Sequence, residues 1–187
     1  MEIRSYSGIA TPQTNGRKIS GYAVVFGVKS VIMYDSENRR MFQEIIEPGA
    51  ITPELLKRSD IKAVLYENSL LARSNKGFGT LTLKIDKRGL YYSFEAPDTT
   101  DGNDALEMIK RGDIFGSSFS FSLNENDSTW IKQKNGVWLR RINSFRQLHS
   151  IVISTDPAYN ETTVTAERML KRDNDYKTQL ELLKRKI

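Results

Sequence analysis

Hydrophobic and polar residues alternate along much of the chain, the period-two pattern that is typical of half-buried β-strands. Runs with strand character lie at 19–26, 42–46, 61–66, 80–85, 90–96, 117–123, 137–142 and 148–154. Two of them, 80–85 and 90–96, flank Asp86-Lys87-Arg88-Gly89, which predicts a hairpin. The polar stretches 30–40 and 124–135 predict loops. The chain is therefore expected to be mainly β.

Helical signals are few before residue 160. A short helix is predicted at 53–57, directly after Pro48-Gly49-Ala50. A second is predicted at 104–110, where the apolar residues cluster on one side and Asp98-Thr99-Thr100-Asp101 supplies N-cap chemistry. Many short strands with one internal helix favour a closed or nearly closed β-barrel, which we place over residues 1–163.

The C-terminal stretch 164–187 has a different pattern. Its apolar residues recur at helical spacing among charges, as a narrow stripe of Met169, Tyr176, Leu180, Leu183 and Ile187. This predicts a charged amphipathic helix outside the barrel, whose stripe meets another surface. A solvated, frayed tail is the alternative.

Charge and composition exclude several kinds of site. The net charge is +5, and the stretch from Thr165 to Ile187, with seven Lys or Arg and four Asp or Glu, carries +3 of it. No basic stripe with interleaved aromatics is present, which argues against nucleic-acid binding. With one histidine and no cysteine, multi-histidine and thiolate metal sites are excluded within a single chain, and no cofactor is expected. No apolar run has membrane-spanning length, and the first residues lack the apolar core of a signal peptide.

The stretch around Ser118 is the strongest candidate for chemistry. Arg111-Gly112-Asp113 ends the predicted helix, and Gly116 opens a strand in which Phe119 and Phe121 point one way while Ser118 and Ser120 point the other. Such a strand can present a serine to a cleft. It can equally be an ordinary strand with small polar residues facing solvent.

Several motifs in order give this chain a resemblance to a known family. They are Gly21-Tyr22-Ala23, Glu44 with Pro48-Gly49-Ala50, Gly79-Thr80-Leu81 with Gly89-Leu90, Ala96-Pro97-Asp98-Thr99, Arg111-Gly112-Asp113, Gly116 to Phe121, and Pro157-Ala158-Tyr159. The ordered set resembles the HK97-type prohead proteases of tailed bacteriophages. That family is related to the herpesvirus assemblins, β-barrel serine proteases that cut scaffolding and capsid proteins inside an immature shell.

The resemblance implies an antiparallel barrel and a capsid or scaffolding protein as partner, with a homodimer as a further option. It also implies action in the host bacterial cytoplasm, within or on the procapsid. In the family's Gly-x-Ser-Phe-x-Phe pattern, Ser118 takes the position of the nucleophile.

The other catalytic positions depart from the family pattern. The family's general base is a histidine just after the strand that corresponds to 61–66, and aligned from that strand Asn68 takes its place. Aligned from Leu71-Ala72-Arg73, the histidine falls in a gap. The third member of the triad falls on Ser150, with His149 beside it. Because neighbouring strand residues face opposite ways, we expect these two side chains to lie on opposite faces.

An asparagine amide cannot take a proton from a serine near neutral pH, so the base is missing on this reading. Lys62, Lys76 or Lys84 could replace it, as could His149 reaching Ser118 across adjacent strands. Three hypotheses follow. They are an active prohead-maturation serine endopeptidase with an unusual constellation, a catalytically inactive capsid-assembly or scaffold-like binding protein, and a cytoplasmic β-barrel binding module that matches the family by coincidence.

Overall fold

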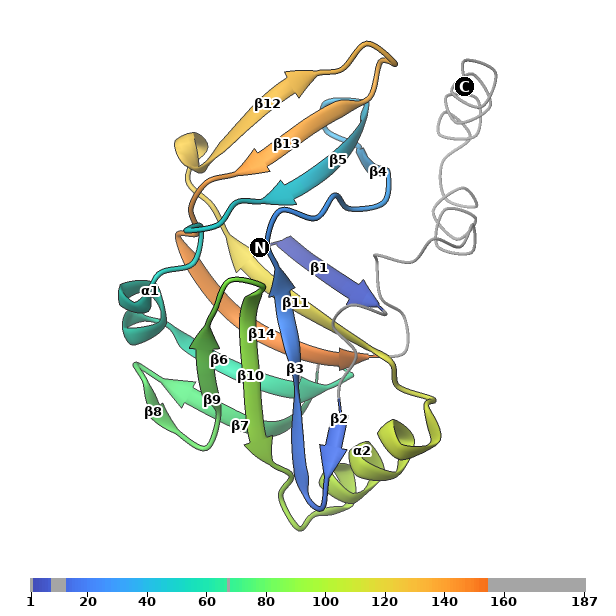
Figure 1. The fold of residues 1–187 in the computed structure, drawn as a ribbon, viewed down its shortest axis with the longest axis vertical. Coiled ribbons are helices and arrows are strands. Elements are labelled where there is room, and N and C mark those ends of the chain that lie inside the picture. Colours follow the sequence, from blue (N-terminus) through green and yellow to red (C-terminus); the bar gives the residue numbers. More distant parts are fainter. Residues whose placement is uncertain (1, 8–12, 67, 155–187) are drawn as a thin grey trace.

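The computed structural model describes residues 2–7, 13–66 and 68–154 (Figure 1). The strands are β1 (Glu2–Ser7), β2 (Gln13–Asn15), β3 (Lys18–Val25), β4 (Met33–Asp35), β5 (Arg40–Ile46), β6 (Asp60–Leu65), β7 (Ser69–Asn75), β8 (Phe78–Gly79), β9 (Thr82–Ile85), β10 (Gly89–Glu95), β11 (Gly116–Ser122), β12 (Ser128–Lys132), β13 (Trp138–Ile142) and β14 (Gln147–Ser154). The helices are α1 (Pro53–Arg58) and α2 (Thr100–Arg111), with a 3-10 turn at Glu125–Asp127.

The strands form three open sheets rather than a closed barrel. One has the order β1-β11-β14-β6-β7-β8, the second β2-β3-β10-β9, and the third β12-β13-β5-β4, which lies at the top of Figure 1. Two pairings, β13 with β5 and β14 with β6, are parallel, and the other strand pairs are antiparallel. The prediction of a mainly β chain is confirmed. The predicted closed or nearly closed antiparallel barrel is not confirmed, because the sheets of the described residues are open and two strand pairs are parallel.

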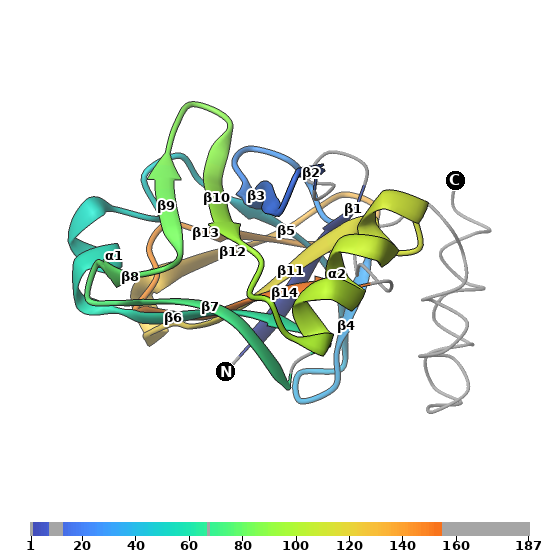
Figure 2. The same cartoon turned by 90° about the horizontal axis from the view of Figure 1, so that it is seen from below.

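The main core lies between the six-stranded sheet and the β2-β3-β10-β9 sheet, which are stacked in Figure 2. The larger sheet contributes Phe119, Phe121 and Ile151, and the smaller one contributes Tyr92 and Leu90; all five are fully or almost fully buried. Both sheets bury alternate residues on facing surfaces. This is why a period-two pattern was visible in each of them.

Both predicted helices are present, and each begins at a side-chain cap. The hydroxyl of Thr52 accepts a hydrogen bond from the amide of Leu55, and Thr99 caps α2 through the amide of Gly102. Helix α2 ends at Gly112, whose φ of 78° lies in the left-handed region that glycine adopts without steric cost. The chain then turns directly into β11.

The predicted loops at 30–40 and 124–135 each contain a strand, β4 and β12. Neither strand shows a period-two alternation long enough to predict it, and their strand conformation comes with the pairing to β5 and β13. In β12, Trp130 packs edge-on against Phe42, with 5.3 Å between ring centroids. The predicted helix over 164–187, and with it the division at residue 163, lies outside the described residues.

Candidate active site

Strand β11 has an inward face of large aromatic side chains, as the sequence predicted. Phe119 and Phe121 are fully buried, and both rings stack on Phe145, with centroid distances of 6.1 and 4.7 Å. Ser117 lies on the same inward face, and its hydroxyl is 2.8 Å from that of Tyr92 on β10. The inward face therefore fixes the position and direction of β11 in the molecule.

Gly21 on β3 leaves the space that the Tyr92 ring fills. A Cβ at position 21 would lie 3.1 Å from the Tyr92 hydroxyl oxygen and 3.3 Å from two ring carbons, closer than most side chains tolerate. Burial raises the pKa of the Tyr92 hydroxyl, so this group stays protonated and can donate to Ser117. The glycine of the Gly21-Tyr22-Ala23 motif thus supports the strand that carries Ser118.

Ser118 lies on the opposite face of β11, yet it is only 5% exposed. Its backbone partners are Ser5 on β1 and Val152 on β14, and Val152 in turn pairs with Val64 on β6. Both valines are buried but lie outside the main core cluster, on the same face as Ser118. The hydroxyl of Ser118 therefore lies in a confined, partly apolar environment.

Ser150 is placed beside Ser120 rather than beside Ser118. The two serines are backbone partners across β14 and β11, and their hydroxyl oxygens are 2.6 Å apart. Because side chains on one face of a strand recur every second residue, Ser120 and Ser150 lie one row along from Ser118. Ser150 thus lies on the same face of the sheet as Ser118, one row of side chains away from it.

His149 shares that face with Ser150, contrary to the expectation from strand alternation. A β-bulge interrupts the pairing: Ser120 pairs with Ser150, but the next residue, Phe121, pairs with Leu148, which leaves His149 as an extra residue on β14. The imidazole Nε2 of His149 lies 3.3 Å from the hydroxyl of Ser122. The expectation of opposite faces is therefore wrong, because the bulge turns His149 toward the row of serines.

The environment of His149 favours its neutral form. Burial lowers the pKa of this imidazole below its ordinary value, because a charged ring loses more hydration than a neutral one. A neutral ring has one nitrogen that accepts a hydrogen bond, and which nitrogen this is depends on the tautomer. His149 can therefore act as an acceptor near neutral pH, and the hydroxyl that it contacts is that of Ser122.

The sequence matches the model of the caudovirus prohead serine protease family over residues 5–175. The chain belongs to this family. No curated protein and no solved structure matches the chain. The family match spans all the described strands from Ser5 onward, including the Ser118 strand and the turn at Asn68.

In this prohead protease family member, Asn68 lies in the turn between β6 and β7. It is exposed, and its backbone amide donates a hydrogen bond of 3.3 Å to the carbonyl of Leu65. Strand β14 lies between β6 and β11 in the sheet, so the turn belongs to a strand two places from that of Ser118. Near it, Tyr66 has a positive φ of 50° and donates its hydroxyl to the sulfur of Met108, at 3.0 Å.

The three candidate lysines lie in different places, and all are exposed. Lys62 on β6 is the backbone partner of Ser150. Lys76 lies in the turn after β7, and Lys84 lies on β9, which belongs to the other stacked sheet. Of the three, Lys62 is the one that the pairing places in the same row as Ser120 and Ser150.

Within the part of the chain that the structure describes, no cluster of three or more His, Cys, Asp or Glu side chains is arranged to hold a metal ion. The helices of that same part include none with the length and apolar character needed to cross a membrane.

The sequence did not predict one residue of this site, Ser122, which is the partner of His149. A signal for it exists in the spacing of the core residues of β14. Leu148, Ile151 and Ile153 are all fully buried, so the interval between the first two is three residues instead of two. An extra residue between successive core positions of a strand marks a bulge.

Proposed function

We propose that this family member acts in procapsid assembly on scaffolding or capsid protein, in the host bacterial cytoplasm, within or on the procapsid. Ser118 holds the position of the nucleophile, and the general base is lost, so that cleavage of peptide bonds is slow or absent. One observation carries the proposal: the chain's single histidine contacts Ser122. The resemblance to the family supports it, because neither alignment of the Asn68 turn restores a histidine there.

The chemical reason is the weak nucleophilicity of a serine hydroxyl. A serine attacks a carbonyl efficiently only when a positioned base removes its proton. Loss of the base from a serine protease lowers turnover on the order of a million-fold, and ~10³–10⁴-fold over water remains from substrate binding and the oxyanion hole. An asparagine amide supplies hydrogen bonds but no proton acceptor.

His149 is poorly placed to replace the base. Its partner Ser122 is four residues from Ser118 along one strand, and a strand rises ~3.3 Å per residue, which separates the two backbone positions by about 13 Å. A base has to come within hydrogen-bond reach of the hydroxyl that it deprotonates, or within one water of it. This separation supports a site that retains Ser118 but has no effective base for it.

A second candidate function is a purely structural role, as a catalytically inactive capsid-assembly or scaffold-like binding protein. The burial of Ser118 favours it, because a nucleophile that is 5% exposed needs local opening before a peptide carbonyl can approach. The two candidates differ in one measurable property. A slow protease still changes the mass of its partner over time, whereas a binding protein does not.

Co-expression with the capsid and scaffolding proteins of the same phage tests the proposal. Assembled particles are purified, and the intact mass of every chain is compared for the wild type, for Ser118→Ala, and for Ser36→Ala as a control at an exposed loop serine. We expect the chain to copurify with particles, and the partner masses and particle yield to be the same in all three. Complete cleavage of a partner that depends on Ser118 would contradict the loss of the base, whereas traces of Ser118-dependent fragments would favour the slow protease over the binding protein. Absence of the chain from particles would contradict the role in assembly.

A further inference from the structure

Strand β1 pairs with one edge of β11, the strand that carries Ser118. The two strands are antiparallel and in continuous register, with Glu2 opposite Phe121 and Ser5 opposite Ser118. Among the described strands, β1 ends the six-stranded sheet, and β11 is its neighbour there. A terminal strand is held by one ladder of backbone hydrogen bonds, whereas an interior strand is held by two.

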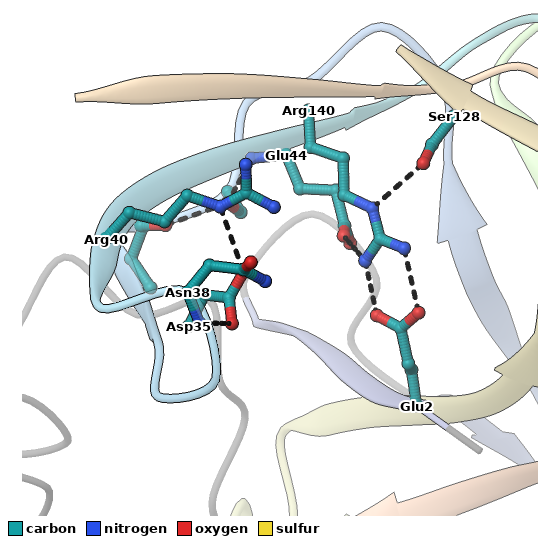
Figure 3. Close-up of polar contacts among 9 residues, drawn as sticks. Glu2, Asp35, Asn38, Arg40, Glu44, Ser128 and Arg140 are labelled. Carbon is teal, nitrogen blue, oxygen red and sulfur yellow. Dashed lines mark hydrogen bonds and ion pairs between the residues drawn. The ribbon is translucent and has the colours of Figure 1, made fainter. Parts of the chain in front are cut away.

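Strand β1 also contacts β3, and its first residue forms a salt bridge to a third sheet. Arg140 on β13 donates two hydrogen bonds to the carboxylate of Glu2, at 2.5 and 2.9 Å (Figure 3). The same guanidinium lies 3.3 Å from the carboxylate of Glu44 on β5, and its Nε donates to the hydroxyl of Ser128 on β12. Arg140 thus connects three neighbouring strands of its own sheet to the first residue of β1.

Arg140 is held by its own sheet as well as by β1. Glu44 is fully buried and the Arg140 side chain is only 12% exposed, and Arg140 and Glu44 are backbone partners in the parallel β13–β5 pair. Held by Glu44 and Ser128, the guanidinium directs its terminal N–H groups at the place where the Glu2 carboxylate lies (Figure 3). A fixed, partly buried guanidinium of this kind is a receptor for one carboxylate, bound through two parallel hydrogen bonds.

We propose that the edge of β11 is a binding site for an extended peptide that carries an acidic residue, and that β1 is its resident occupant. The peptide adds to β11 as an antiparallel strand, and its backbone supplies most of the affinity. Arg140 supplies selectivity for a carboxylate at the position three residues before the one that pairs with Ser118.

This inference deepens the proposed function, because the peptide would be a segment of the scaffolding or capsid protein. The proposed peptide binding does not depend on the reactivity of Ser118. The site places such a segment directly beside Ser118, and β1 therefore controls access to that strand. Since β1 and the peptide compete for one edge, the apparent affinity for the peptide is reduced by the fraction of molecules in which β1 is bound.

The test uses a fluorescent peptide with the sequence of residues 2–7, titrated with the full-length chain and followed by fluorescence anisotropy. Glu2→Gln in the protein removes the charge that holds β1 and leaves Arg140 in place. We expect this variant to bind the peptide about tenfold tighter than the wild type does, because β1 detaches more often. Glu95→Gln, at an exposed position on β10, is the matched control and should bind as the wild type does.

A second peptide, with Gln in place of its Glu, tests the role of Arg140. We expect it to bind the Glu2→Gln protein about tenfold more weakly than the first peptide, through loss of the charge-assisted pair. Arg140→Lys, which keeps the positive charge beside Glu44, should abolish the preference between the two peptides. The control is Arg40→Lys, since Arg40 pairs with Asp35 within its own hairpin and does not reach β1 (Figure 3). Equal binding of the two peptides to the Glu2→Gln protein would overturn the proposal, as would equal binding of the first peptide by the wild-type and Glu2→Gln proteins.

A reversible disulfide between β1 and β11 tests the proposal even if the substitutions above disturb folding. Residues 3 and 120 are backbone partners, and the chain has no cysteine, so Ile3→Cys with Ser120→Cys can form one disulfide only. We expect peptide binding to be lost on oxidation and regained on reduction, and to be unaffected by Ser118→Ala. Binding that persists in the oxidised variant would place the peptide elsewhere. Because the assay reads binding alone, its failure would leave the proposal about the missing base untouched.

Discussion

The imidazole Nε2 of His149 lies 3.3 Å from the hydroxyl of Ser122, on the same face of the sheet as Ser118 but two rows away from it. The bulge between Ser120 and Phe121 creates this contact, because it gives β14 one residue more than β11 over the same length. The chain's single histidine therefore lies at the Ser122 end of the row formed by Ser118, Ser120 and Ser122. The contact bears on the proposed loss of the base, since the resemblance implies a histidine in that role.

Burial of His149 predicts a specific pH dependence of stability. Its pKa is lowered in the folded state, so on acidification the unfolded chain takes up the proton first. The contribution to stability is complete above the ordinary histidine pKa of 6.5, and it falls as the pH drops below that value. We expect His149→Gln to lose less stability than the wild type between pH 7.5 and pH 5.5, measured by urea unfolding at both values. An equal loss in both proteins would show that the imidazole titrates normally.

Phe121 is expected to be among the most important residues for stability. Phe121→Ala removes a fully buried ring that stacks on Phe145 with 4.7 Å between centroids, and should cost about 3–5 kcal/mol of unfolding free energy. Phe78 is the matched control, because its side chain is 82% exposed, and Phe78→Ala should change stability by less than about 0.5 kcal/mol. Chemical denaturation of both variants measures the difference, and comparable losses would contradict the described core.

Gly21 and Tyr92 are predicted to be energetically coupled. Gly21→Ala should destabilise the fold by roughly 1–3 kcal/mol, because its Cβ would lie 3.1 Å from the Tyr92 hydroxyl. Tyr92→Phe removes that hydroxyl, so Gly21→Ala should cost less in the Tyr92→Phe background than in the wild type. A double-mutant cycle of unfolding free energies measures this coupling. Strict additivity would mean that the hydroxyl does not limit residue 21.

Much of the fold was predictable from the sequence where each strand buries one face. The alternation of Phe119 and Phe121 with Ser118 and Ser120 correctly predicted the two faces of β11. The closed or nearly closed barrel was not confirmed, because alternation specifies which side of a strand is buried but not which strands are neighbours. The parallel pairings of β13 with β5 and of β14 with β6 connect strands far apart in the chain, and no local pattern encodes them.

The candidate site was predictable in part. Alternation placed Ser118 on the face away from the aromatic core, and it is the observed pairing of Ser150 with Ser120 that puts Ser150 on that same face. Alternation failed for His149, because it assumes two residues per repeat and the bulge breaks that rule. The three-residue interval between the buried residues Leu148 and Ile151 was the available evidence of the bulge. The salt bridge of Glu2 to Arg140 joins residues 138 positions apart, and it had no sequence signal at all.

The reactivity of Ser118 toward a fluorophosphonate probe tests the loss of the base most directly. The probe is incubated with the full-length wild type and with Ser118→Ala near neutral pH, beside an active serine hydrolase as positive control, and the adduct on each chain is located by mass spectrometry. With no base at Ser118, we expect little labelling of the wild type and the same low level in Ser118→Ala. Strong labelling of the wild type at Ser118, abolished by Ser118→Ala, would contradict the account and would mean that His149 or a lysine serves as the base.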